Sequence, residues 1–205
     1  MNFLKLSFVL LAMVVVSGCS FLYQAPQPPE SDAIIDVTQS DEEFHIADFE
    51  AVNQSGVEIS KKDMLGEWWL AKTIFTRCPT VCMTMTPNMV DLQGEILERD
   101  LDIRIVSFTV DPEFDTPERL EDYGESYGAS FDNWDFVTGY SQEHIKEFSL
   151  ESFRVPVVPG DNDIGHPTRF YLINPEGEIV RFYSGESRFD LDAISKDLEF
   201  LLSNE

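Results

Sequence analysis

The apolar positions of this chain follow two different periods. Residues 68–75 and 103–110 form two mostly apolar runs, which are typical of strands buried on both faces of a parallel sheet. Between these runs, apolar side chains recur about every 3.6 residues, as they do on the buried face of a helix. These side chains are Met85, Met89, Leu92, Ile96 and Leu97. The pattern therefore predicts a buried strand, a helix and a second buried strand.

The start of this helix has two interpretations. In the first, Thr86 caps the helix and Pro87 occupies the first turn, where a residue without an amide hydrogen is tolerated. In the second, the helix begins at the cysteines, Cys78 and Cys82, and Pro87 kinks it. The sequence leaves both starts open.

Three later segments also carry helix signals. Residues 115–118 supply a capping residue and a proline, placed to open a helix that ends near Tyr127. Residues 141–148 predict another helix, with Glu143 in its first turn. A closing amphipathic helix is indicated by four apolar positions, Leu191, Ile194, Leu198 and Leu201.

Two hairpins and one short strand complete the pattern. Residues 44–52 and 57–60 flank a turn, and residues 168–173 and 178–183 flank another. Residues 134–137 predict a short strand. The resulting order is a β-hairpin, βαβαβα, a second β-hairpin and a helix. We therefore predict an α/β, thioredoxin-like fold, in which helices flank a mostly parallel central sheet extended by an N-terminal β-hairpin.

The N-terminus has the features of a secretory signal. Lys5 precedes the mostly apolar residues 6–16, a run shorter than the about 20 residues that a membrane-spanning helix needs. Small residues then lead to Cys19, as in the lipobox of bacterial lipoproteins, where this cysteine carries the lipid. The alternative is an uncleaved anchor helix that ends near Phe21 or Leu22.

Three regions follow from this interpretation. Residues 1–18 are expected to be a lipoprotein signal peptide. Residues 19–42, which contain Pro26, Pro28 and Pro29, are expected to be a lipid-anchored linker without helical or strand period. Residues 43–205 are expected to form the globular domain, which faces the extracytoplasmic side of the cell membrane.

The composition narrows the class of partner. The 205 residues include 14 basic and 38 acidic side chains, for a formal net charge of −24. Such a surface repels nucleic acid and anionic lipid headgroups, so we exclude nucleic-acid binding. Since 43% of the residues are apolar, the chain has enough apolar side chains to form a core.

Cysteine is the residue type most informative about chemistry. Of three cysteines, Cys19 is assigned to lipid, which leaves Cys78 and Cys82 at a strand-to-helix turn. A spacing of four places both sulfurs on one side of a helix. Amide hydrogens and the helix dipole at such a turn stabilise thiolate, and the adjacent Arg77 adds positive charge.

Two chemistries remain open for this pair. A structural disulfide across so short a loop would remove little chain entropy, so it would stabilise the fold poorly. A redox pair in this fold is usually spaced CxxC, whereas CPTVC is one residue wider. Two thiolates in such a loop suit Cu(I), a soft ion of low coordination number, whereas Zn(II) would want four ligands.

A third ligand would have to come from a distant part of the chain. His45 and His144 are more simply explained as solvent-facing or satisfied histidines, and His144 lies in an acidic helix. His166 ends the irregular segment 151–165, just before a strand, at a junction that lies opposite the cysteine turn in a thioredoxin-like topology. His166 is therefore the candidate ligand; the isomer of the bond before Pro167 is left open.

These residues together resemble the Sco (SenC) family of membrane-tethered copper proteins of cytochrome c oxidase assembly. The matching segments are residues 75–82 with CPTVC, residues 107–117 with DPEFDTP, and His166 followed by residues 170–177. The resemblance covers residues 44–202. It implies a thioredoxin-like fold in which Cys78, Cys82 and His166 hold copper, as Cu(I), Cu(II) or both.

The resemblance also implies a function. Family members are expected to be copper chaperones rather than enzymes, delivering copper to the CuA centre of cytochrome c oxidase subunit II. One alternative is a thiol–disulfide reductase that keeps the CuA cysteines reduced, with Cys78 and Cys82 as its redox pair and no need of His166. Another alternative is a redox or copper sensor.

Other residues near these motifs have simpler explanations. The resemblance points to Asp111 as a residue that orients a cysteine or His166 through a hydrogen bond. Asp115 is interpreted as an N-cap or turn residue. The methionines that follow Cys82 are left out of the site, because Met85 and Met89 fit a core-facing stripe and Met83 is expected to be exposed.

Overall fold

The computed structural model describes residues 27–160 and 163–203. Its centre is an eight-stranded sheet in the order β1-β10-β9-β4-β5-β6-β2-β3. The strands are β1 (Ile34–Asp36), β2 (Glu50–Asn53), β3 (Glu58–Ser60), β4 (Trp68–Ile74), β5 (Ile103–Thr109), β6 (Trp134–Thr138), β9 (Arg169–Ile173) and β10 (Ile179–Ser184). A separate small hairpin consists of β7 (Val158–Pro159) and β8 (Ile164–Gly165).

Strands β4, β5 and β6 are parallel and form the middle of the sheet. On one side β9, β10 and β1 continue it in antiparallel fashion, and on the other side the β2–β3 hairpin pairs with β6. The helices are the 3-10 turn η1 (Lys61–Met64) and α2 (Cys82–Glu98), α3 (Pro117–Tyr127), α4 (Gln142–Phe153) and α5 (Leu191–Ser203). This arrangement confirms the predicted α/β fold.

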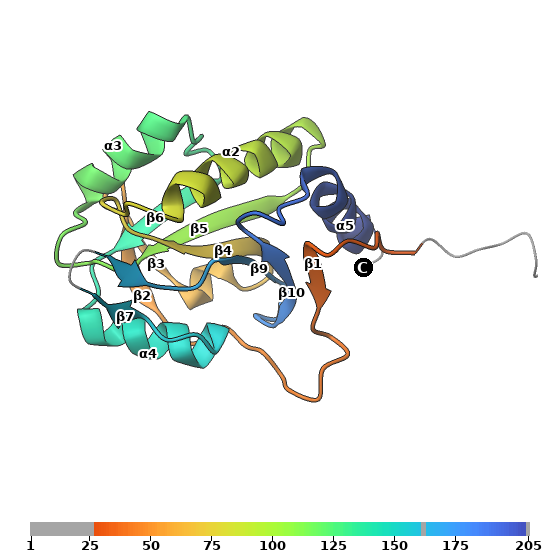
Figure 1. The fold of residues 1–205 in the computed structure, drawn as a ribbon, viewed down its shortest axis with the longest axis horizontal. Coiled ribbons are helices and arrows are strands. Elements are labelled where there is room, and N and C mark those ends of the chain that lie inside the picture. The colour runs from red at the N-terminus through yellow and green to blue at the C-terminus, as the bar shows by residue number, and fades with distance from the viewer. Residues whose placement is uncertain (1–26, 161–162, 204–205) are drawn as a thin grey trace, which may run out of the picture.

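The helices cover both faces of the sheet. Helix α2 contacts α3 and α5 on one face, and α4 lies on the opposite face (Figure 1). Below the sheet, the ring of Phe148 on α4 lies 4.7 Å from that of Phe108 on β5, and Phe153 stacks on Tyr171 at 4.1 Å. Both faces of the central strands are therefore buried, which explains why β4 and β5 lack a polar alternation.

The structure resolves the two interpretations of the first helix. Helix α2 begins at Cys82, and Pro87 lies inside it. The cap predicted at Thr86 is therefore wrong; Thr86 is fully buried and its hydroxyl accepts a hydrogen bond from Lys72. In the next helix the N-cap is Thr116, which accepts a hydrogen bond from the amide of Arg119, and Pro117 is the first helical residue.

Three segments differ from the sequence prediction. Ile34–Asp36, which we expected within the linker, forms edge strand β1 against β10 between the buried Ala33 and Val37. A strand of three residues is too short to show a period. In the segment 44–52 only Glu50–Asn53 is a strand, with one isolated bridge at His45. Helix α4 continues to Phe153, and the segment expected to be irregular contains β7 and β8.

The predicted signal peptide, the lipid attachment at Cys19 and the first part of the linker lie outside the described residues. Across the described ranges, no helix is long and apolar enough to cross a membrane.

Two helical glycines provide a matched test of the packing above the sheet. A methyl group at Gly124 in α3 would lie 2.7 Å from the Phe131 ring and 3.0 Å from the Phe136 ring, whereas one at Gly94 in α2 would meet nothing within 4 Å. We expect Gly124→Ala to lower the free energy of unfolding by about 1–3 kcal/mol. Gly94→Ala should raise it by up to about 1 kcal/mol. Urea denaturation measures both, and equal effects would contradict this packing.

Candidate metal centre

The two cysteines lie where β4 passes into α2. The amide of Cys78 donates to the carbonyl of Phe75 at 3.2 Å, and the amide of Cys82 donates to Cys78 Sγ at 3.4 Å. Cys78 is partly exposed, and Cys82, the first residue of α2, is 1% exposed. The loop therefore presents one accessible sulfur and one buried sulfur, and amide hydrogens of the helix start point at the accessible one.

His166 approaches this pair from the segment between β8 and β9. Its ring is buried, and Nε2 lies 3.7 Å from Cys82 Sγ. The nearest ligand atoms of Cys78, Cys82 and His166 all lie within 4.8 Å of one another. The structure thus brings together the three residues that the sequence singled out, and in the described residues they are the one group of three such side chains arranged to hold a metal ion.

Hydrogen bonding at Nδ1, the ring nitrogen that faces away from the cysteines, fixes the orientation of the His166 ring. Thr73 Oγ1 donates to the carbonyl of Pro167 at 2.9 Å, so the hydroxyl hydrogen is already used. Nδ1 lies 2.9 Å from both of these oxygens, which can then only accept from it. Nδ1 therefore carries the hydrogen, and the lone pair of Nε2 faces the cysteines.

Sequence reasoning missed Thr73, because nothing in the pattern of β4 distinguishes it from its buried neighbours. Phe75, two residues further on, packs edge-on against the imidazole with ring centroids 5.7 Å apart. The peptide bond before Pro167, which the sequence left open, is trans. The end of β4 therefore supports both the cysteine loop and the histidine.

The two thiols have opposite proton affinities. A hydrogen bond from the Cys82 thiol lowers the pKa of Cys78 to about 3, with smaller contributions from the amides of Cys82 and Thr80, and burial opposes this shift. The same hydrogen bond and burial raise the pKa of Cys82 well above its usual value. The metal-free reduced pair thus holds one proton, on Cys82, and Cys78 is the thiolate.

Asp111 does not have the predicted contacts. Its buried carboxylate accepts a hydrogen bond from Arg77 Nε at 2.6 Å, and no hydrogen bond joins it to Cys78, Cys82 or His166 in the described structure. Because Arg77 immediately precedes Cys78, Asp111 holds the cysteine loop rather than a ligand.

Asp115 is likewise not the N-cap that the sequence suggested. It is fully buried and accepts hydrogen bonds from the amide of Thr76 at 3.1 Å, from the Thr76 hydroxyl at 2.5 Å, and from the Thr109 hydroxyl. Burial raises the pKa of Asp115, and these hydrogen bonds oppose the shift. Asp115 therefore ties the ends of β4 and β5 together directly below the cysteine loop.

The methionines lie as expected. Met85 and Met89 are fully buried in the core, and Met83 is 61% exposed beside Cys82. His45 is half-exposed beside Glu43. The expectation of a solvated His144 is wrong in part: its Nε2 is buried without a hydrogen-bond partner among the described residues.

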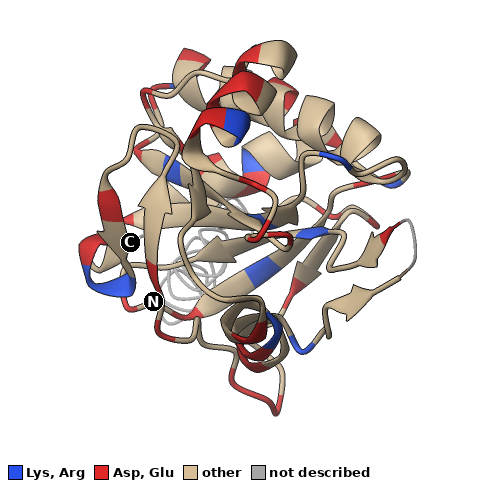
Figure 2. Ribbon diagram, turned by 90° about the vertical axis from the view of Figure 1, so that its left-hand side faces the viewer, with Lys and Arg blue, Asp and Glu red and all other residues tan. Residues whose placement is uncertain are grey.

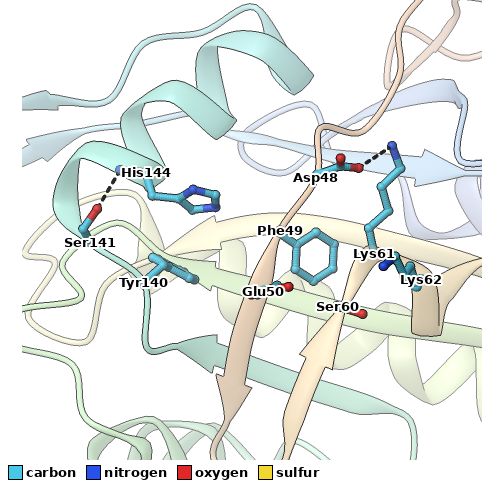
Figure 3. A pocket seen from close by; sticks show the side chains of 9 residues that line it. All are labelled: Asp48, Phe49, Glu50, Ser60, Lys61, Lys62, Tyr140, Ser141 and His144. Carbon is cyan, nitrogen blue, oxygen red and sulfur yellow. Dashed lines mark hydrogen bonds and ion pairs between the residues drawn. The ribbon is translucent and has the colours of Figure 1, made fainter.

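A surface hollow of about 490 Å³ lies beside His144 (Figure 3). Its lining side chains include Tyr140 and the ion pair of Lys61 with Asp48, at 3.2 Å. Cys78, Cys82 and His166 do not line it. The hollow is therefore separate from the metal centre.

Comparison with known proteins agrees with the geometry. The sequence profile described as SCO1/SenC matches residues 37–203. The chain belongs to the SCO1/SenC family. A SCO1 protein homolog of Bacillus subtilis (strain 168) is 42% identical over 158 residues, which cover 76% of this chain and 82% of that protein.

Solved structures of relatives share the Sco fold. A SCO1/SenC family lipoprotein from Bacillus anthracis has a TM-score of 0.75 at 37% identity, covering 79% of this chain and 98% of its own. BsSco, studied for a disulfide switch and described as a member of the Sco family of cytochrome c oxidase assembly proteins, has a TM-score of 0.73 at 40% identity, covering 80% and 96%. Copper-bound ScoI from Arabidopsis thaliana has a TM-score of 0.65 at 26% identity, covering 77% and 98%.

The difference in pKa between Cys78 and Cys82 predicts how the two thiols react with an alkylating agent. Iodoacetamide should modify Cys78 first, at a rate that changes little from about pH 5 to about pH 8, whereas the rate for an ordinary thiol rises about tenfold per unit below its pKa of about 8.5. Mass spectrometry of peptides quenched at each pH measures this rate. In Cys82→Ala, which lacks the thiol donor, the rate should regain a pH dependence. A tenfold rise per unit in the unmodified chain would contradict the assignment of the thiolate.

Proposed function

We propose that this chain is a copper chaperone, anchored by lipid on the extracytoplasmic side of the membrane, that delivers copper to the CuA centre of cytochrome c oxidase subunit II. Cys78, Cys82 and His166 are its copper ligands. The observation that carries the proposal is the convergence of their ligand atoms within 4.8 Å. The family membership and the copper-bound plant relative support the choice of metal and of pathway.

The donor set suits copper as a cargo. Two thiolates and one imidazole satisfy Cu(I), which accepts soft ligands at low coordination number. The same set can serve Cu(II) when a further oxygen ligand completes the coordination. A structural zinc site would want a fourth protein ligand, and the group found in the described residues has three.

The arrangement also favours release. Cys78 lies on the loop between β4 and α2 and Cys82 begins α2, whereas His166 lies on a different segment, after β8. A hydrogen bond of 2.9 Å from the Thr80 hydroxyl to Asp163 links these two segments at the surface. Withdrawal of the histidine segment would leave copper on the two sulfurs alone, which a recipient with more ligands can displace.

The location and the partner follow from other features. Cys19 is the proposed lipid attachment site, the residues after it lead to the domain that begins with β1, and a relative from Bacillus anthracis is described as a lipoprotein. Asp and Glu residues occur on many elements of the described structure, and Lys and Arg residues are fewer (Figure 2). This charge favours a basic patch on the recipient.

A thiol–disulfide reductase is the second candidate, and one observation favours it. Cys78 is an accessible thiolate with a protonated thiol beside it, as an attacking and a resolving cysteine would be. Cys78 would attack the recipient's disulfide and release one recipient thiolate. Cys82 would then lose its proton and attack Cys78, releasing the second thiolate and leaving a Cys78–Cys82 disulfide. The disulfide switch described for BsSco is compatible with such a pair.

Copper titration tests the chaperone proposal. The reduced chain should bind one equivalent of Cu(II) with a sulfur-to-copper charge-transfer band. His166→Ala should weaken binding by more than about 100-fold, because even the loss of a residue that only orients a ligand costs about 10–100-fold. The half-exposed His45 provides the matched control, and His45→Ala should bind like the unmodified chain. Unchanged affinity in His166→Ala, together with loss of thiol exchange in Cys78→Ser, would favour the reductase.

The role of Thr73 predicts a smaller effect. Thr73→Val keeps the shape of the side chain but removes the hydroxyl that accepts from Nδ1 of His166. Copper affinity should fall by about 10–100-fold, because the ring loses part of what fixes its orientation. The same titration measures this change, and the charge-transfer band should survive. An affinity equal to that of the unmodified chain would show that the carbonyl of Pro167 alone orients the ring.

A further inference from the structure

Lys72 is a fully buried lysine on β4, the strand that leads into the cysteine loop. It lies in β4, is 0% exposed, and its Nζ is 5.8 Å from the ring centroid of Trp134 and 5.7 Å from that of Phe170. Lysine is almost never fully buried without a charged partner, since burial of an ammonium group disfavours its charged form. No carboxylate forms an ion pair with Lys72 in the described structure.

The ammonium is held by a short polar chain that leads to the start of α2. Nζ donates to the hydroxyl of Thr86 at 3.0 Å, and Thr86 Oγ1 lies 2.7 Å from the hydroxyl of Tyr123 on α3. Thr86 follows Cys82 by four residues, so the two side chains share one face of α2. The neighbouring strand residue, Thr73, points to the opposite face and binds His166. Two consecutive residues of β4 thus contact the elements that carry the ligands, Lys72 through Thr86 on α2 and Thr73 through His166 itself.

The cysteine pair interacts electrostatically with Lys72. Burial lowers the pKa of Lys72 to about 7, and the negative charge of the cysteine pair opposes this shift. In return, the charge of Lys72 opposes the rise in the pKa of Cys82. The Thr86 hydroxyl and the two aromatic rings that lie against Lys72 carry no net charge.

We propose that Lys72 is the internal counter-charge of the metal centre and makes it prefer Cu(I) over Cu(II). This inference rests on the proposed copper-binding function. Cu(I) with two thiolates carries a charge of −1, which the ammonium neutralises. Cu(II) with two thiolates is neutral, and the ammonium leaves an uncompensated positive charge in a buried site. His166 is neutral as a ligand, so it changes the total charge of neither the Cu(I) site nor the Cu(II) site.

Lys72→Met tests this inference, because methionine keeps the length of the side chain and removes the charge. Affinity for Cu(I) is measured anaerobically by competition with bicinchoninate, and affinity for Cu(II) by competition with glycine. A nearby opposite charge shifts an ionisation equilibrium by about 1–3 pKa units, so the ratio of Cu(I) to Cu(II) affinity should fall by about 10-fold or more. The exposed Lys62 supplies the control, since Lys62→Met makes the same change in net charge and should leave the ratio unchanged.

The outcomes separate the two proposals. If the unmodified chain binds neither ion, the copper-binding function fails. If it binds both ions but the ratio is unchanged in Lys72→Met, or both affinities fall in parallel, the counter-charge role alone is overturned. The variant should fold, because it replaces a buried ammonium by an apolar group, and urea denaturation checks this. If Lys72→Met does not fold, Lys72→Gln replaces it in the same measurement. The same fall in the ratio of Cu(I) to Cu(II) affinity is expected.

Discussion

One contact across the fold makes this site: the 3.7 Å approach of His166 Nε2 to Cys82 Sγ, between residues 84 positions apart in the chain. The approach is useful for metal binding only because the lone pair of Nε2 faces the sulfur, and the acceptors at Nδ1 impose that tautomer. A thiolate, a thiol and an imidazole would otherwise be better solvated in water than partly buried together. The surrounding fold must therefore hold them in place.

Strand β4 supplies most of the contacts that hold the cysteine loop and His166 in place. It is the central strand between β5 and β9, and its end leads directly into the cysteine loop. Asp115 fixes Thr76 below that loop, Asp111 fixes Arg77 beside it, and Thr73 fixes His166. The buried strand thus supplies rigidity, whereas Cys78 and His166 lie on loops and Cys82 begins α2. This division suits a protein that must hold an ion and later give it up.

The sequence was sufficient to predict the topology and the three converging side chains. Apolar runs and helical periods located β4, β5 and α2, and the CPTVC spacing indicated the metal chemistry. His166 could be found because it lies at the junction before β9. Thr73, Lys72 and Asp115 could not be assigned in this way, since their roles depend on which side chain meets them across the sheet. Asp115 also matched a capping pattern that the adjacent Thr116 in fact fulfils. Strand β1 was missed because three residues show no period.

X-ray absorption at the copper edge of the loaded chain tests the central claim most directly, because it counts ligand atoms around the ion. The account predicts two sulfur neighbours and one imidazole, the imidazole being recognised by the outer scattering of its ring. Sulfur scattering without an imidazole would contradict the account, as would a shell of nitrogen and oxygen alone.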